Sequence, residues 1–169
     1  MKRQTKIVIL SVAVLFAATV CLWFINDSGI NRTGGGVVIN ITENGELFAE
    51  AGMEYVKGLE SETIGATIRS SGNKPVDVEY KGVPLKHFLE CLGINLDGRE
   101  NVVVKGVDGY MALLSMEELE QKDIYIAYEM DGKALKPREQ GGYGPFQLVI
   151  PGDPFSQRWC KYVCEVEVK

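Results

Sequence analysis

Residues 144–152 read GPFQLVIPG. Within this stretch the apolar run 147–150 predicts a short strand, because Pro151-Gly152 ends it with two residues that sheets disfavour. Before it, the run 124–130 predicts a second strand. After it, residues 159–168 alternate strictly in polarity, which predicts a third strand. In that strand one side is expected to carry Cys160, Tyr162, Cys164, Val166 and Val168, and the other Lys161, Glu165 and Glu167.

The turn residues in the rest of the chain after residue 37 separate short segments that are typical of a domain with both strands and helices. Strands are predicted at 37–42, 63–69, 76–80, 101–105 and 110–114. Three segments are predicted to be helical: part of 46–59, a helix opened by Pro84 and closed by Gly93, and a short helix with Ser115 as its N-cap. The predicted fold class is therefore α+β, mixed and largely β, and it is preceded by one transmembrane helix.

The N-terminal part predicts that helix. Residues 7–25 contain no charged side chain and follow Lys2, Arg3 and Lys6. At 1.5 Å per residue the run spans about 28 Å, close to the hydrocarbon thickness of a bilayer. The basic flank predicts a cytoplasmic N-terminus and a single-pass membrane protein whose C-terminal domain is extracytoplasmic.

A cleaved signal peptide is the other interpretation of this run. A retained anchor is favoured because bulky apolar residues continue up to Ile25, past the small residues that cleavage requires. The predicted domains are a signal anchor at 1–25, a glycine-rich linker at 26–36 and a folded domain at 37–169.

Composition excludes several function classes. The chain has 18 basic and 23 acidic side chains, for a net charge of −5, so it lacks the basic surface of a nucleic-acid-binding protein. A single histidine leaves little for a histidine-based metal site or a Ser-His-Asp triad. That residue, His87, is interpreted as a surface or packing residue.

The cysteines are interpreted as buried packing residues. Cys160 and Cys164 on one strand would lie about 13 Å apart, beyond disulfide reach. Cys91 falls in the apolar pattern of its helix and is expected in the core. A bridge from Cys91 to either of the other two stays open as an alternative.

Five blocks that follow one another after residue 80 carry a family resemblance. They are KGVPL at 81–85, VDGY at 107–110, IAYEMDG at 126–132, GPFQLVIPG at 144–152 and RWCK at 158–161. In this order and spacing they resemble the oxidoreductase molybdopterin-binding domain of the sulfite oxidase superfamily. That family has G-V-P-L, D-G-Y, A-Y-x-x-N-G-x-x-L, G-x-P-x-R-L-V-V-P and K-W blocks. The resemblance covers about 63–169 and extends to the strands back to residue 37.

The resemblance implies two-electron oxygen-atom transfer at molybdenum held by a pterin dithiolene and one cysteine thiolate. That cysteine lies about a dozen residues before the G-V-P-L block, where this chain has Ser70. A hydroxyl is a harder and far less acidic donor than a thiol, so we expect no molybdenum site of the family type. The family's phosphate-binding arginine corresponds to Gln147, which lacks a charge. Lys161 is retained at the K-W position.

The resemblance implies further pocket residues in Arg69, Asp108 and Tyr110, of which Arg69 is placed to contact an anion. Three functions follow. The first is a membrane-anchored module that binds a ligand or a protein and holds no cofactor or metal. The alternative is an active molybdopterin-dependent oxidoreductase with Ser70, or no protein ligand, at the metal, served by a membrane redox partner. The third is a structural or assembly role at the membrane.

Overall fold

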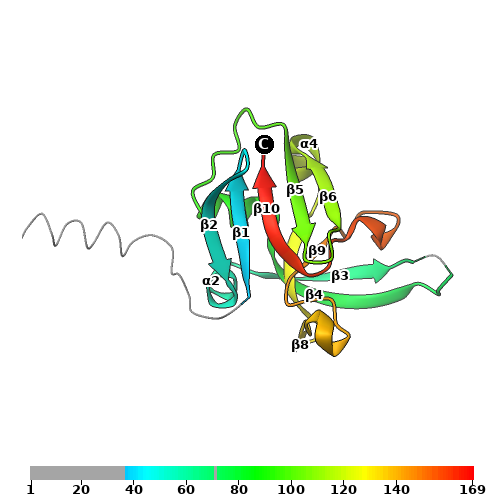
Figure 1. Cartoon of the computed structure of the whole chain (residues 1–169). Coiled ribbons are helices and arrows are strands. Elements are labelled where there is room, and N and C mark those ends of the chain that lie inside the picture. The colour runs from blue at the N-terminus through cyan, green and yellow to red at the C-terminus, as the bar shows by residue number, and fades with distance from the viewer. Residues whose placement is uncertain (1–36, 71) are drawn as a thin grey trace, which may run out of the picture. The chain divides into compact units, whose positions relative to one another are not determined.

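Two sheets of five strands make up the part of the chain that the computed structural model describes, residues 37–70 and 72–169 (Figure 1). The predicted anchor, the linker and their boundary fall in residues 1–36 and lie outside the described residues. Among the residues described, no helix has both the length and the apolar character needed to cross a bilayer.

The first sheet consists of two hairpins joined by a central strand. Its order is β2-β1-β10-β5-β6, and β10 is parallel to β1 and antiparallel to β5. The strands are β1 Val38–Glu43, β2 Glu46–Gly52, β5 Asn101–Gly106, β6 Met111–Ser115 and β10 Val163–Val168. The strand that occurs last in the sequence therefore lies in the middle of this sheet (Figure 1).

The second sheet is built on a long hairpin and carries the strand predicted from GPFQLVIPG. Its order is β3-β4-β7-β8, and β9 also pairs with β7. The strands are β3 Glu62–Ile68, β4 Val76–Pro84, β7 Tyr125–Met130, β8 Lys133–Ala134 and β9 Gln147–Val149. Antiparallel pairing of β9 with β7 sets Gln147 opposite Ala127.

Short helices connect the strands: α2 Met53–Gly58, α3 Leu85–Cys91, α4 Met116–Gln121, and the 3₁₀ turns η1 Arg138–Gln140 and η2 Ser156–Arg158. Ser115 caps α4 as predicted, since its Oγ accepts a hydrogen bond from the Glu118 amide while the Glu118 carboxylate accepts one from the Ser115 amide. The predicted apolar face of α3 is confirmed by Leu85, Phe88 and Leu89, which are fully buried.

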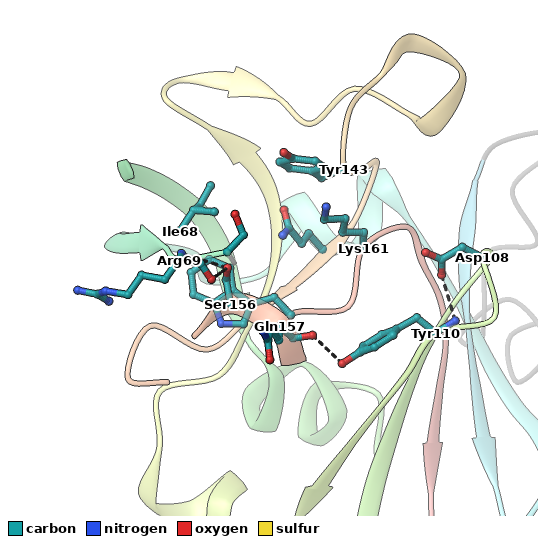
Figure 2. Close-up of a pocket in the computed structure, with 11 residues that line it drawn as sticks. Ile68, Arg69, Asp108, Tyr110, Tyr143, Ser156, Gln157 and Lys161 are labelled. Atoms are coloured by element: carbon teal, nitrogen blue, oxygen red, sulfur yellow. Dashed lines mark hydrogen bonds between the residues drawn. The ribbon is translucent and has the colours of Figure 1, made fainter. Parts of the chain in front are cut away.

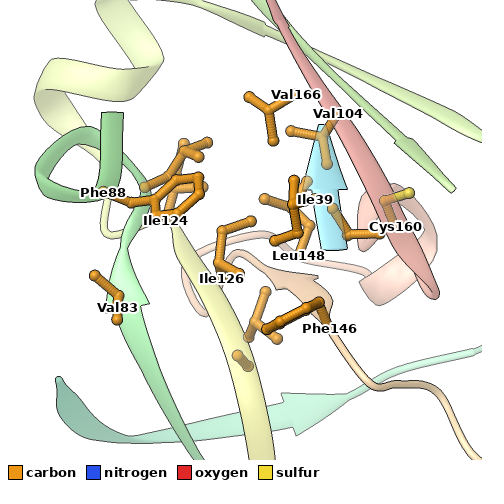
Figure 3. Close-up of a cluster of buried hydrophobic side chains, with 14 of the residues drawn as sticks. Ile39, Val83, Phe88, Val104, Ile124, Ile126, Phe146, Leu148, Cys160 and Val166 are labelled. Atoms are coloured by element: carbon orange, nitrogen blue, oxygen red, sulfur yellow. The ribbon is translucent and has the colours of Figure 1, made fainter. Parts of the chain in front are cut away.

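One core fills the space between the two sheets. Ile39, Val104 and Val166 enter it from the first sheet, and Ile126 and Leu148 from the second; all five are fully buried (Figure 3). Each such side chain stabilises the fold by about 1.5–3 kcal/mol through removal of apolar surface from water. Of these five, Val166 was predicted by alternation to lie on the apolar side of its strand, and it is fully buried.

The prediction that residues 46–59 are helical in part is confirmed, but the strand β2 in the first half of this segment was not predicted. Residues 46–52 form β2 because Ala49 and Ala51 alternate into the core and pair with Ile41 and Ile39 of β1. Only Met53–Gly58 is helical. Pairing with β1 outweighed the local preference of residues 46–52 for a helix.

The prediction of a strand from residue 159 was also wrong at its start. Tyr162 has a φ of +55°, a left-handed conformation that no strand residue adopts, and β10 begins at Val163. A bulge follows between Val163 and Glu165, so Val163, rather than Tyr162, is buried. The irregular residues before β10 are hydrogen-bonded to both sheets: the Tyr162 carbonyl accepts from the Val107 amide after β5, and the Cys160 carbonyl from the Leu148 amide of β9.

The predictions for the three cysteines after residue 37 were correct in part. Cys160 is fully buried in the core as predicted, and Cys164 is half-buried. Cys91 is exposed on α3, so its predicted place in the core was wrong; the apolar face of this short helix is complete with Leu85, Phe88 and Leu89. The three cysteines of the described residues are free, and neither of the disulfides left open by the sequence is formed among them.

The glycine of the KGVPL block is required by a close approach of two strands. A Cβ atom at Gly82 of β4 would lie 2.7 Å from the Ile126 carbonyl oxygen and 2.8 Å from the Ala127 Cα atom of β7. We predict that Gly82→Ala lowers the free energy of unfolding by about 1–3 kcal/mol, because backbone must move to admit the methyl group. Urea denaturation measures the change.

Gly65 provides the matched control. It lies in β3 of the same sheet, and a Cβ atom there would meet nothing within 4 Å. Gly65→Ala should leave the free energy of unfolding unchanged or raise it by up to about 1 kcal/mol. Equal denaturation midpoints for the two variants would contradict the role given to Gly82.

Candidate functional site

A cavity of about 290 Å³ opens where the two sheets and the segment before β10 meet. All six site residues named from the sequence line it: Arg69, Ser70, Asp108, Tyr110, Gln147 and Lys161. They come from four separate parts of the chain, namely the end of β3, the β5–β6 turn, the first residue of β9 and the segment before β10. The fold therefore brings together residues that are up to 92 positions apart, from 69 to 161.

Ser70 lies just beyond the end of β3 and begins a turn. Its carbonyl accepts a hydrogen bond from the Asn73 amide at 3.3 Å, and its Oγ accepts one from Asn73 Nδ2 at 3.2 Å. The hydroxyl proton of Ser70 remains available for donation to a ligand. The side chain offers a neutral oxygen to the cavity.

Arg69 is fixed by Ser156, a cavity residue that the sequence analysis missed. The Ser156 hydroxyl donates to the Arg69 carbonyl at 2.9 Å and accepts from the Arg69 amide at 3.2 Å, and the Ser156 amide donates to the same carbonyl at 3.2 Å. Because the two residues are 87 positions apart, no local pattern indicates the pair. The Arg69 guanidinium extends away from Lys161 and Tyr143 (Figure 2).

An ion-pair network holds η2, and with it Ser156 and Gln157, against the body of the domain. Arg158 Nε lies 2.8 Å from the Asp153 carboxylate, and Arg158 Nη2 lies 2.9 Å from the Glu118 carboxylate of α4. Lys122 Nζ contacts the same two carboxylates at 3.2 and 3.0 Å. Hydrogen bonding from Arg158 lowers the pKa of Glu118 from its ordinary value of 4.5 to about 2.

Asp108 and Tyr110 form the wall opposite Arg69. Asp108 Oδ1 accepts a hydrogen bond from the Tyr110 amide at 3.1 Å, and the Tyr110 hydroxyl donates to the Gln157 carbonyl at 2.7 Å (Figure 2). Burial raises the pKa of Tyr110, so its hydroxyl stays protonated. Its only proton is used within the protein, which leaves Tyr110 a structural role in the wall.

Lys161 is covered by an aromatic ring. Its Nζ lies 4.1 Å from the centroid of the Tyr143 ring, an arrangement that favours a cation at this point (Figure 2). Tyr143 belongs to the segment before β9, which lies tightly against its neighbours: a Cβ atom at Gly144 would be 2.5 Å from the Leu135 carbonyl oxygen. The glycines on either side of Tyr143, Gly142 and Gly144, are thus packed against Lys136 and Leu135.

Gln147 contributes a buried amide. Its side chain is 2% exposed, and its Oε1 has no hydrogen-bond partner among the described residues. The neighbouring Tyr80 hydroxyl is also buried and forms no hydrogen bond of good geometry; burial raises its pKa, and the nearby Gln147 side chain lowers it to a smaller extent. An unsatisfied buried carbonyl oxygen costs about 1–3 kcal/mol, which a ligand that donates a hydrogen bond would recover.

None of the three cysteines in the described residues lines the cavity. Cys160 is next to Lys161, but its Sγ lies within the core and points to backbone carbonyls, 3.6 Å from the Lys161 oxygen. Burial, with smaller effects of Asp108 and Cys164, raises the pKa of Cys160 to about 12, so it is a neutral thiol at physiological pH. The described residues also contain no cluster of three histidine, cysteine or acidic side chains suited to a metal ion.

The donor set at the cavity therefore does not fit a molybdenum centre with a protein thiolate. Ser70 supplies a neutral oxygen, and the free thiols lie elsewhere. A neutral amide, Gln147, stands where the sequence resemblance implies a phosphate-binding guanidinium. The cavity has the charge and the hydroxyl groups for a polar ligand, but it lacks the soft anionic donor for the metal.

Comparisons with known proteins agree on the fold. The family model described as "Oxidoreductase molybdopterin binding domain" matches residues 46–169. Among solved structures, the chain is similar to the sulfane dehydrogenase SoxCD from Paracoccus pantotrophus, with a TM-score of 0.66 and 20% sequence identity. The similarity covers 83% of this chain and 40% of that chain, so this chain spans less than half of its structural relative. A search of curated protein sequences finds no match.

The Glu118 ion pairs predict an acid dependence of stability. Because the pKa of Glu118 is lowered by folding, its contribution is complete above about pH 4.5 and is lost as the pH falls through about 2. We predict that the thermal midpoint of the wild-type protein falls more steeply over this range than that of Glu118→Gln, which cannot titrate. Thermal melts at pH steps between 5 and 2 measure the difference.

Glu117→Gln is the control. Glu117 lies beside Glu118 on α4 and accepts a hydrogen bond from Gln121, but it forms none of the ion pairs of the network. This variant should keep the wild-type pH profile. If the thermal midpoints of Glu118→Gln and the wild-type protein fell equally with pH, the network would not stabilise η2 through the charge of Glu118.

Proposed function

This chain belongs to the oxidoreductase molybdopterin-binding domain family, and we propose that it uses the family's cavity to bind a small anionic ligand without holding molybdenum. The observation that carries the proposal is the pair of neutral groups at the two positions where the family's chemistry needs charge. Ser70 occupies the position of the metal-binding cysteine, and Gln147 occupies the position of the phosphate-binding arginine.

Lys161 is the group that favours an anion. It places a positive charge in the cavity beside the Tyr143 ring, and Asp108 places a negative charge on the opposite side, while the Arg69 guanidinium extends away from Lys161. The Ser70 hydroxyl can donate to an oxyanion, while the buried Gln147 Oε1 can accept a hydrogen bond from the ligand. A volume of about 290 Å³ lies at the lower end of the range of about 300–1,000 Å³ typical of ligand pockets, so the ligand is small.

The alternative is an active molybdopterin-dependent oxidoreductase with a metal site that uses no cysteine. One observation favours it: the cavity is open, and all six positions that the family resemblance indicates line it. Such an enzyme would require a membrane redox partner to exchange electrons. A structural or assembly role, the third function, has no comparable support, because an assembly module has no need of an open cavity lined with charges.

We also propose that residues 1–25 anchor the domain in the membrane, with the domain outside the cytoplasm. The support is the uncharged run at 7–25 with its basic flank. The full chain should stay in the membrane pellet after alkaline carbonate extraction, and protease added outside should digest the domain in intact spheroplasts. Release of the full chain by carbonate would contradict the anchor.

The binding proposal predicts that a small oxyanion stabilises the protein through Lys161. Thermal melts of the full chain with inorganic phosphate, and with acetate as a carboxylate probe, should show a higher midpoint than melts with chloride at equal ionic strength. At about 100 times Kd a ligand stabilises the folded state by about 2.7 kcal/mol. Lys161→Met, which keeps the apolar stem against Tyr143, should abolish the increase.

Lys81→Met is the matched control, because Lys81 is an exposed cation of β4 that does not line the cavity. It should keep the wild-type response to both anions. No midpoint increase with either probe, or an equal increase in Lys161→Met, would overturn anion binding in the cavity.

Metal analysis separates the proposal from its alternative. Protein purified from native membranes should contain far less than one molybdenum or tungsten atom per chain, and Ser70→Cys should gain metal if the thiolate is the missing donor. Stoichiometric molybdenum or tungsten in the wild-type protein would establish the oxidoreductase instead.

A further inference from the structure

The exposed face of α3 carries a pair of side chains that the cavity does not use. Leu85, Phe88 and Leu89 fill the buried face of this helix, so residues 87 and 91 point outward, one turn apart. His87 is half-buried and Cys91 is exposed. These are the only histidine of the chain and the one exposed free thiol of the described residues.

The two side chains already lie at the separation of two ligands of one metal ion. Cys91 Sγ is 3.4 Å from His87 Nε2 and 3.8 Å from Nδ1. With metal–sulfur and metal–nitrogen bonds of about 2.3 and 2.05 Å, a tetrahedral angle places sulfur and nitrogen about 3.6 Å apart. The observed 3.4 Å corresponds to an angle of about 103° at the metal.

We propose that His87 and Cys91 form a surface chelate for a borderline d-block dication such as Zn²⁺. A thiolate and an imidazole are the donors that such ions prefer, and hard ions such as Mg²⁺ reject them. On binding, the Cys91 thiol loses its proton to solvent and the thiolate forms the metal–sulfur bond, while neutral His87 donates a nitrogen lone pair. No electron transfer is involved.

The surroundings of the pair leave the remaining coordination positions open. Lys86 is paired with Glu120, so neither competes for the site. Water or a second copy of the pair completes the coordination.

Cobalt(II) is the probe for the experiment, because thiolate coordination gives it a charge-transfer absorption in the near ultraviolet. The full chain, kept reduced with a phosphine, should develop this band with Co²⁺ and lose it to Zn²⁺ but not to Mg²⁺. Cys91→Ser should abolish the band. His87→Ala should weaken Co²⁺ binding at least about tenfold, since even residues that only support a metal ligand contribute about 10–100-fold.

Cys164→Ser is the matched control, because Cys164 is a second, half-buried thiol on β10 with its Sγ 3.5 Å from the Lys105 carbonyl. It should keep the band and the affinity. Both α3 substitutions lie on the surface, so thermal melts of the metal-free variants should match the wild-type protein. One ion per two chains, with a dimer lost in both α3 variants, would also support the chelate, completed by a second copy.

Two results would overturn the proposal. They are a band that survives Cys91→Ser, and an affinity for Co²⁺ that His87→Ala leaves unchanged. Neither result bears on anion binding in the cavity, because the chelate shares no residue with it.

Discussion

The backbone of residues 160–163 connects the two sheets, and the cavity depends on that connection. The Cys160 carbonyl accepts from Leu148 of β9 at 2.8 Å, and the Val163 amide donates to Phe146 at 2.9 Å. On the other side, the Tyr162 carbonyl accepts from Val107 at 3.1 Å. The left-handed conformation of Tyr162 lets one short segment serve both sheets, and Lys161 within it faces the cavity.

The groups that the cavity can offer to a ligand are those that are not already paired within the protein. Arg158 and Lys122 neutralise Asp153 and Glu118 below the cavity, so these four charges are satisfied within the protein. Tyr110 uses its proton on the Gln157 carbonyl. The groups left for a ligand are therefore Lys161, Asp108, the Ser70 hydroxyl and the Gln147 amide. Such a set suits hydrogen bonding to an oxyanion and offers nothing to a soft metal ion.

Much of this could be predicted from sequence, because apolar alternation and turn residues are local signals. Nearly all the strands were predicted, and the ordered family blocks indicated six residues that the fold gathers around one cavity. The failures arose where distant contacts decide local structure. β2 is a strand because β1 pairs with it. Ser156 reaches Arg69 across 87 positions.

The pair on α3 was missed for a different reason. Cys91 was assigned to the core by hydrophobicity alone, and His87 was then left without a partner in the sequence analysis. The signal that could have found the pair is the H-x₃-C spacing itself, which on any helix places the two side chains on one face. Only the structure shows that three other residues complete the buried face.

The central place of β10 also has a consequence for how the domain assembles. The hairpins β1–β2 and β5–β6 are made earlier in the chain, yet each has its inner edge paired only with β10. A nascent polypeptide that has not reached residue 163 therefore holds two detached ribbons with open edges and apolar inner faces. The unpaired backbone groups at these open edges can pair with strands of other chains. Nucleation of this sheet must wait for long-range closure, and a holding chaperone would be most useful in that interval.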